Sequence, residues 1–164
     1  MNMFNVSFLF AAYIASAQAQ TGSTFKIMNQ KLFEGGEKDF CLTPRRNGRA
    51  NSAVVLKECN IADNQDFSVD SQGRLVNNKS KTCLSAKGSK LRVAKCDAGN
   101  DPASKYVYKT MDNALAIFNG EGVGYLTPVD ADNQSDERGI RLRPRNYKNK
   151  VQKWVIVDSD MDKS

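Results

Sequence analysis

Cys41-Leu42-Thr43 recurs at equal intervals as Cys83-Leu84-Ser85 and as Tyr125-Leu126-Thr127. A polar turn and an apolar residue precede each copy. A variable loop, a short strand and an apolar closing segment follow it. The chain after about residue 20 therefore consists of three repeats of about 40 residues, and the architecture has to accommodate all three.

The repeats are predicted to form a β-trefoil. Their segments are short, alternate between apolar and polar residues, and are separated by Gly, Asn, Asp and Pro, which is typical of strands. No helical stripe lasts for three turns. A propeller needs at least four blades, and a solenoid needs capping ends. Three four-stranded repeats can instead close on a pseudo-threefold axis, which also removes exposed edge strands. We therefore expect an all-β fold.

The repeat also predicts the core, with one position left open. In the middle closing segment the spacing favours Val107, whereas aromatic character favours Tyr106. The residues expected to point inward are Leu32, Leu75, Leu115, Leu42, Leu84, Leu126, Leu56, Val93, Leu142, Phe67, Tyr106 or Val107, and Trp154.

The chain has four cysteines and no histidine. The cysteines show no C-x-x-C spacing, so two disulfides are the simplest assignment, with three connectivities available. Repeat symmetry selects Cys41–Cys59 and Cys83–Cys96, since each pair occupies equivalent positions of its own repeat. The third repeat has Tyr125 and Arg145 at these positions.

The same composition limits the chemistry. Without histidine there is no Ser-His-Asp or Cys-His nucleophilic site and no histidine-bearing zinc site. Pairs of acids such as Asp130 and Asp132 exist, but nothing in the sequence shows that they converge in a cleft. We therefore expect a binding protein without a cofactor or metal, and not an enzyme.

Residues 1–19 are predicted to be a secretory signal peptide. The first 24 residues carry no charged side chain, and 3–19 form the only long apolar stretch. Small residues at 15, 17 and 19 fit cleavage after Ala17 or Ala19. The alternative, an uncleaved anchor, is less favoured because the run is shorter than a membrane span requires. We expect a secreted protein with a domain over 25–157, a polar tail over 158–164, no transmembrane segment in the mature chain, and usable glycosylation sequons at Asn78 and Asn133.

These repeats resemble those of ricin B-type (R-type) β-trefoil lectins. The resemblance covers about residues 25–157 and rests on the Cys-Leu strands, the cysteine pairs within repeats, and the Gln-x-aromatic signature. That signature stands at Gln65-Asp66-Phe67 and Gln152-Lys153-Trp154 and is degraded in the middle repeat. The resemblance implies a lectin that binds galactose-type or related sugars of glycans or glycoproteins in shallow pockets, up to one per repeat.

Carried over residue by residue, the resemblance implies degenerate pockets. The aspartate expected after Cys-Leu is Thr43, Ser85 or Thr127, and the expected aromatic platform is Lys57, Ala94 or Arg143. The remaining polar positions are the predicted carbohydrate-binding residues, Asn64, Gln65 and Gln152. Two alternatives stay open: Gln65 and Gln152 could instead tie backbone in the closing turn, and Asp130, Asp132 and Asn133 could supply replacement acceptors.

Positive charge is concentrated in the third repeat. The net charge of the chain is +6, and seven basic residues without an intervening acid lie between Arg138 and Lys153. Arg141, Arg143 and Arg145 alternate with Ile140, Leu142 and Pro144, so a strand would place the guanidinium groups outward and the apolar residues inward. Arg45, Arg46 and Arg49 form a second cluster.

The alternative function is therefore a basic β-trefoil that binds sulfated glycans, other polyanions or a partner protein through Arg141, Arg143 and Arg145 without recognising sugar. A solvated face that maintains solubility is the other interpretation of this charge. Nucleic acid is not an expected partner, because no nucleic-acid module is present.

Overall fold

The computed structural model describes residues 23–30, 38–96, 106–109, 114–118, 123–129, 136–146, 148 and 150–159. Side chains at 63, 106–109, 114–118, 123 and 150 are outside this description. The described strands are β1 (Phe25–Asn29), β2 (Phe40–Pro44), β3 (Val54–Glu58), β4 (Phe67–Val69), β5 (Leu75–Asn77), β6 (Thr82–Lys87), β7 (Lys90–Lys95), β8 (Tyr106–Lys109), β9 (Ala114–Phe118), β10 (Val123–Pro128), β11 (Glu137–Arg143) and β12 (Trp154–Asp158). Short 3-10 turns include η1 (Arg46–Gly48), η2 (Asp63–Gln65) and η5 (Lys150–Gln152).

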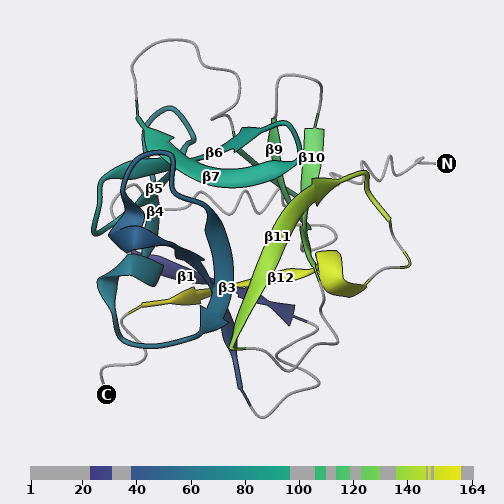
Figure 1. Cartoon of the computed structure of the whole chain (residues 1–164), viewed down its shortest axis with the longest axis horizontal. Helices are drawn as coiled ribbons and strands as arrows, with labels where there is room; N and C mark the ends of the chain where they lie inside the picture. Colours follow the sequence, from purple (N-terminus) through teal and green to yellow (C-terminus); the bar gives the residue numbers. More distant parts are fainter. Residues whose placement is uncertain are drawn as a thin grey trace, which may run out of the picture.

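Every repeat contributes four strands, of which the second and third form an antiparallel hairpin. These hairpins are β2–β3, β6–β7 and β10–β11. The first strand of the chain lies beside the last one, and β1 pairs with β12 along its whole length (Figure 1). β1 also pairs with β4, and β4 with β5. This pairing of chain ends closes the sheet on itself, as a β-trefoil requires.

The three hairpins pair with one another around one end of the fold. β11 pairs with β3 through Glu137–Gly139 and with β7 through Arg141. An isolated bridge between Ala53 and Arg92 joins the first and second hairpins. Hairpin edges that would otherwise be open are thus satisfied by neighbouring repeats, which protects them from pairing with other molecules. The predicted β-trefoil is confirmed.

The core confirms the predicted residues whose side chains are described. All of them are buried, and Trp154 and Phe67 are the largest fully buried side chains. The indole Nε1 of Trp154 donates a hydrogen bond to the carbonyl oxygen of Leu126 at 3.2 Å, so its polar atom is satisfied inside the core. The confirmed residues are Leu42, Leu56, Phe67, Leu75, Leu84, Val93, Leu126, Leu142 and Trp154.

The structure corrects the core of the first repeat at one position. β1 ends at Asn29, and the residue equivalent to Leu75 is the fully buried Ile27 and not the predicted Leu32. The equivalence follows from the asparagines two residues later. The Asn77 amide donates to the carbonyl oxygens of Asn64 and Asp66, and the Asn29 amide donates to those of Val151 and Lys153. The first repeat has a longer connection after its asparagine, so the spacing to the cysteine does not identify Ile27.

Both predicted disulfides are present. Cys41–Cys59 and Cys83–Cys96 have Cα–Cα distances of 4.9 and 5.1 Å, within the normal range. Each bond clamps the open end of a hairpin in its own repeat. Among the described residues, no helix has the length and apolar character needed to cross a membrane.

Several predictions fall outside the described residues. They concern the signal peptide over 1–19, most of the tail over 158–164, Leu32, the side chains of Leu115, Tyr106 and Val107, and the loop residues Asp130, Asp132 and Asn133.

Candidate functional site

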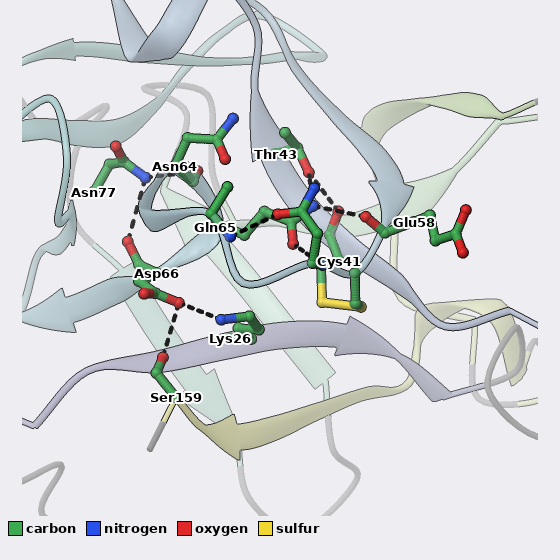
Figure 2. A network of polar contacts seen from close by, with 12 residues as sticks. Lys26, Cys41, Thr43, Glu58, Asn64, Gln65, Asp66, Asn77 and Ser159 are labelled. Carbon is green, nitrogen blue, oxygen red and sulfur yellow. Dashed lines mark hydrogen bonds and ion pairs between the residues drawn. A yellow bond between two sulfur atoms is a disulfide. The ribbon is translucent and has the colours of Figure 1, made fainter. Parts of the chain in front are cut away.

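In the first repeat, the side-chain amide of Gln65 forms hydrogen bonds within the protein. Its Nε2 donates to Thr43 Oγ1 at 3.0 Å and to the Glu58 carbonyl oxygen at 2.9 Å, while its Oε1 accepts from the Asn60 amide at 2.8 Å. Thr43 in turn donates to the Cys41 carbonyl oxygen. Figure 2 shows the amide enclosed between the Thr43 strand and the closing turn. Gln65 therefore fixes the geometry around the expected pocket.

In the third repeat, Gln152 repeats this arrangement. Its Nε2 donates to Thr127 Oγ1 at 2.9 Å and to the Pro144 carbonyl oxygen at 3.0 Å, and its Oε1 accepts from the Asn146 amide at 2.8 Å. Thr127 donates to the Tyr125 carbonyl oxygen. The same three glutamine hydrogen bonds are therefore present in both repeats. In each, a threonine stands at the aspartate position of the resembled family, and its hydroxyl oxygen accepts a hydrogen bond from the glutamine amide.

Asn64 and Lys57 are the other first-repeat positions of the expected sugar pocket. The Asn64 side-chain oxygen is buried and has no hydrogen-bond partner among the described residues. Lys57, at the position of the aromatic platform, forms an ion pair with Glu137 at 3.1 Å between Nζ and Oε2. A paired ammonium offers no flat apolar face to a sugar ring. The first repeat thus has no stacking surface, and its one unpaired polar acceptor is buried.

A buried polar network lies next to Asn64 (Figure 2). Lys26 Nζ lies 2.6 Å from Asp66 Oδ1, with side chains only 4% and 13% exposed. The Ser159 hydroxyl donates to the same carboxylate oxygen at 2.9 Å. This network ties the first and last strands to the closing turn of the first repeat, so breaking one partner would leave a buried charge uncompensated.

The third repeat contains an open pocket of about 560 Å³ at the corresponding place. Gln152 and Thr127 form its polar base, and Arg143, Arg145 and Lys148 supply three cations. Pro144 and Asn146 complete the lining. The structure therefore brings one predicted carbohydrate-binding residue together with two predicted polyanion-binding residues.

An aromatic contact positions Arg145 at this pocket. Its guanidinium lies over the Tyr125 ring, 5.5 Å from the ring centroid. Its NH1 group also lies 3.4 Å from Gln152 Oε1. This contact occupies the place of the disulfides in the other two repeats, and it holds the cation at the pocket edge.

The basic strand is shorter than the alternation predicted. β11 ends at Arg143, and Pro144 is exposed instead of facing inward. Proline lacks the N–H group for a further ladder bond, and its carbonyl oxygen is taken by Gln152. Arg141 and Arg143 remain exposed on the outer face, while Arg141 lies outside the pocket lining.

Sequence reasoning missed Asn146 and Lys148 as pocket residues. Their place follows from the turn after β11, which the spacing of the repeats did not reveal. Within the described ranges, no cluster of three or more His, Cys, Asp or Glu side chains could hold a metal ion.

The closed arrangement of three hairpins around a common core defines a β-trefoil domain. Residues 29–154 match the family described as ricin-type beta-trefoil lectin domain. The chain belongs to this family.

Known structures agree with the fold. The β-trefoil lectin of the Vibrio vulnificus hemolysin/cytolysin, solved with N-acetyl-D-lactosamine bound, is 19% identical with a TM-score of 0.64, covering 83% of this chain and 94% of that chain. The C-terminal half of the earthworm R-type lectin, in complex with GalNAc, is 16% identical with a TM-score of 0.66, covering 83% and 98%. The designed threefold-symmetric protein ThreeFoil is 16% identical with a TM-score of 0.65, covering 82% and 98%. No curated protein sequence matches the chain significantly.

Proposed function

We propose that the protein is a secreted carbohydrate-binding module without catalytic activity. Its main site is the third-repeat pocket, and its ligand is a glycan that carries a sulfate or carboxylate group. The observation that carries this proposal is the meeting of Gln152 and Thr127 with Arg143 and Arg145 in one open pocket.

Membership of a lectin family supports sugar as the ligand class. The residues that line the pocket indicate that the sugar carries an acidic group, because guanidinium groups match sulfate and carboxylate oxygens in charge and geometry. Arg143 stands where the resembled family has a stacking ring, so a charged contact replaces an apolar one. Affinity for neutral sugars is therefore expected to be poor.

The first repeat contributes a weaker subsite in this proposal. Asn64 is the sugar contact of this subsite, but its side-chain oxygen is buried, so the side chain has to turn outward to meet a sugar hydroxyl. Gln65 acts by holding Thr43 and the closing turn in place. Gln152 has the same positioning role in the third repeat. Lys57 does not take part, since Glu137 already binds it.

A glycan array with matched neutral, carboxylated and sulfated glycans tests the proposal. Acidic glycans are expected to bind more strongly than their neutral counterparts and to be ranked by sugar identity as well as by charge. The rival, polyanion binding without sugar recognition, gives binding that ignores sugar identity and collapses between low and moderate salt. That result, or stronger binding of neutral glycans, would overturn the proposal.

Secretion is supported by the two disulfides, which persist in oxidising compartments. Mass spectrometry of the protein collected from the medium of expressing cells is expected to show a first residue after Ala17 or Ala19. A chain retained in cells with residues 1–19 intact would contradict it.

A further inference from the structure

A second concave surface lies between the first and second repeats. This groove has a volume of about 800 Å³ and shares no lining residue with the third-repeat pocket. One wall comes from η1 and the residues after it, and the other comes from the start of β6 and the end of β7. We refer to it as the inter-repeat groove.

The inter-repeat groove is strongly basic. Arg46 and Arg49 line it from the first repeat, and Lys81 and Lys95 line it from the second, and no acidic residue is among the lining residues that the structure describes. All four side chains belong to exposed residues. None of them forms an ion pair with an acid in the part of the chain that the structure describes.

The neighbouring residue Arg45 shows what distinguishes these four cations. Arg45 forms an ion pair with Glu137, as Lys38 does with Glu58. The four cations of the groove instead line one concave surface. Like charges gathered in a concavity focus the potential there and favour an anion.

The two walls are held together by a close backbone approach. Gly48 has a φ of +74°, and a Cβ atom at this position would clash with the Ser80 side chain. Thr82 Oγ1 donates to the Gly48 carbonyl oxygen at 3.0 Å. The approach of the two walls is therefore fixed by backbone and short side chains where the two repeats meet.

The backbone conformation of two of the cations is unusual. Arg46 has a φ of +50° and Lys81 a φ of +55°, and non-glycine residues rarely adopt this region. One residue stands on each wall of the inter-repeat groove. Such conformations persist only where the surrounding structure imposes them, and they are concentrated at ligand-binding sites.

We propose that the inter-repeat groove binds a sulfate ester group of a sulfated glycan, independently of the third-repeat pocket. Two guanidinium and two ammonium groups supply donors and charge for such an oxyanion. A membrane surface fits less well, because the site is concave and its described lining contains no large apolar side chain that could insert into lipid. The proposal would stand even if the third-repeat pocket bound no sugar.

The test measures binding of dextran sulfate, with unmodified dextran as the uncharged control. Lys81→Gln/Lys95→Gln removes two charges from the groove. Lys87→Gln/Lys90→Gln removes two charges from the opposite end of the same hairpin and serves as the matched control. The groove variant is expected to lose roughly tenfold in affinity, and the control less than about threefold. Equal losses would show a general charge effect and overturn the proposal.

Arg46→Gln/Arg49→Gln provides a second, independent groove variant with the same expected loss. Arg143→Gln, which alters the third-repeat pocket alone, is expected to keep the difference between the two lysine variants. These variants thereby distinguish a failure of the groove proposal from a failure of the third-repeat pocket proposal. Binding to phosphatidylserine vesicles without binding to dextran sulfate would assign the groove to membranes and overturn the proposal.

Discussion

The Arg145 guanidinium stacks on the Tyr125 ring at the place where the other two repeats carry a disulfide. The register establishes the equivalence: Tyr125 is opposite Arg143, as Cys41 is opposite Lys57 and Cys83 is opposite Ala94. Repeats one and two close their hairpins covalently. Repeat three closes its hairpin with a cation–π contact, and this leaves a guanidinium at the edge of a pocket.

This equivalence predicts that a third disulfide can be installed. Tyr125→Cys/Arg145→Cys is expected to form the bond and to raise the free energy of unfolding by about 2–4 kcal/mol. Intact mass, thiol titration and denaturant unfolding with and without reductant measure the outcome. Thiols that remain reactive under oxidising conditions would show that the third hairpin differs from the first two.

The buried amide of Gln65 is expected to be important for stability. Gln65→Leu keeps approximate volume but leaves the Glu58 carbonyl and the Asn60 amide without their side-chain partner, and it removes the donor to Thr43 Oγ1. We expect a loss on the order of 3 kcal/mol in the free energy of unfolding. The control Gln72→Leu, at an exposed turn, should stay within about 0.5 kcal/mol of wild type. Equal effects of both substitutions would refute the structural role.

Gly48 and Gly73 form a natural pair for separating steric from conformational cost. Both have a φ of +74°, but a Cβ atom would clash with Ser80 only at Gly48 and meets nothing within 4 Å at Gly73. Gly73→Ala should cost about 1 kcal/mol, and Gly48→Ala at least about 1 kcal/mol more. Thermal or chemical unfolding measures the difference, and indistinguishable stabilities would argue against the close approach of the two repeats.

The environment of Asp70 is expected to make the free energy of unfolding depend on pH. Burial alone would raise its pKa, but hydrogen bonds from Arg74 and from the Gln72 backbone, with the Arg74 charge, lower the pKa below its ordinary value of 3.8. A lowered carboxyl pKa stabilises the folded state at higher pH, and this contribution disappears as pH falls through the folded-state pKa. Wild type should therefore exceed Asp70→Asn in stability at pH 7 and lose this advantage below pH 3.8. An advantage that persists at the lowest pH would contradict the assignment.

Equal spacing made much of the fold predictable from the sequence. Leu42, Leu84 and Leu126 recur at fixed intervals, so symmetry alone indicated their burial and the pairing of the cysteines. Ile27 was missed because the first repeat has a longer connection between Asn29 and Cys41 than the second has between Asn77 and Cys83. A shared apolar-x-Asn pattern, as in Ile27-Met28-Asn29 and Leu75-Val76-Asn77, would have revealed the correct alignment.

The sites were harder to predict than the fold. The contact of Arg145 with Tyr125 depends on how the chain turns after Pro144, and alternation along a strand gave no sign of that turn. The inter-repeat groove combines Arg46 with Lys81 and Lys95 from another repeat. Such a combination arises only when two repeats pack together, so residue spacing within one repeat cannot indicate it.

The most direct test of the central claim is the affinity for galactose 6-sulfate against galactose, measured by titration calorimetry. Arg143→Gln alters the pocket lining, whereas Arg141→Gln removes the same charge from the same strand outside that lining. We expect galactose 6-sulfate to bind more tightly than galactose to wild type and to Arg141→Gln. In Arg143→Gln this preference should fall by roughly tenfold, equivalent to about 1.4 kcal/mol. An unchanged preference in Arg143→Gln, or an equal loss in both variants, would contradict the assignment of the third-repeat pocket as an acidic-glycan site.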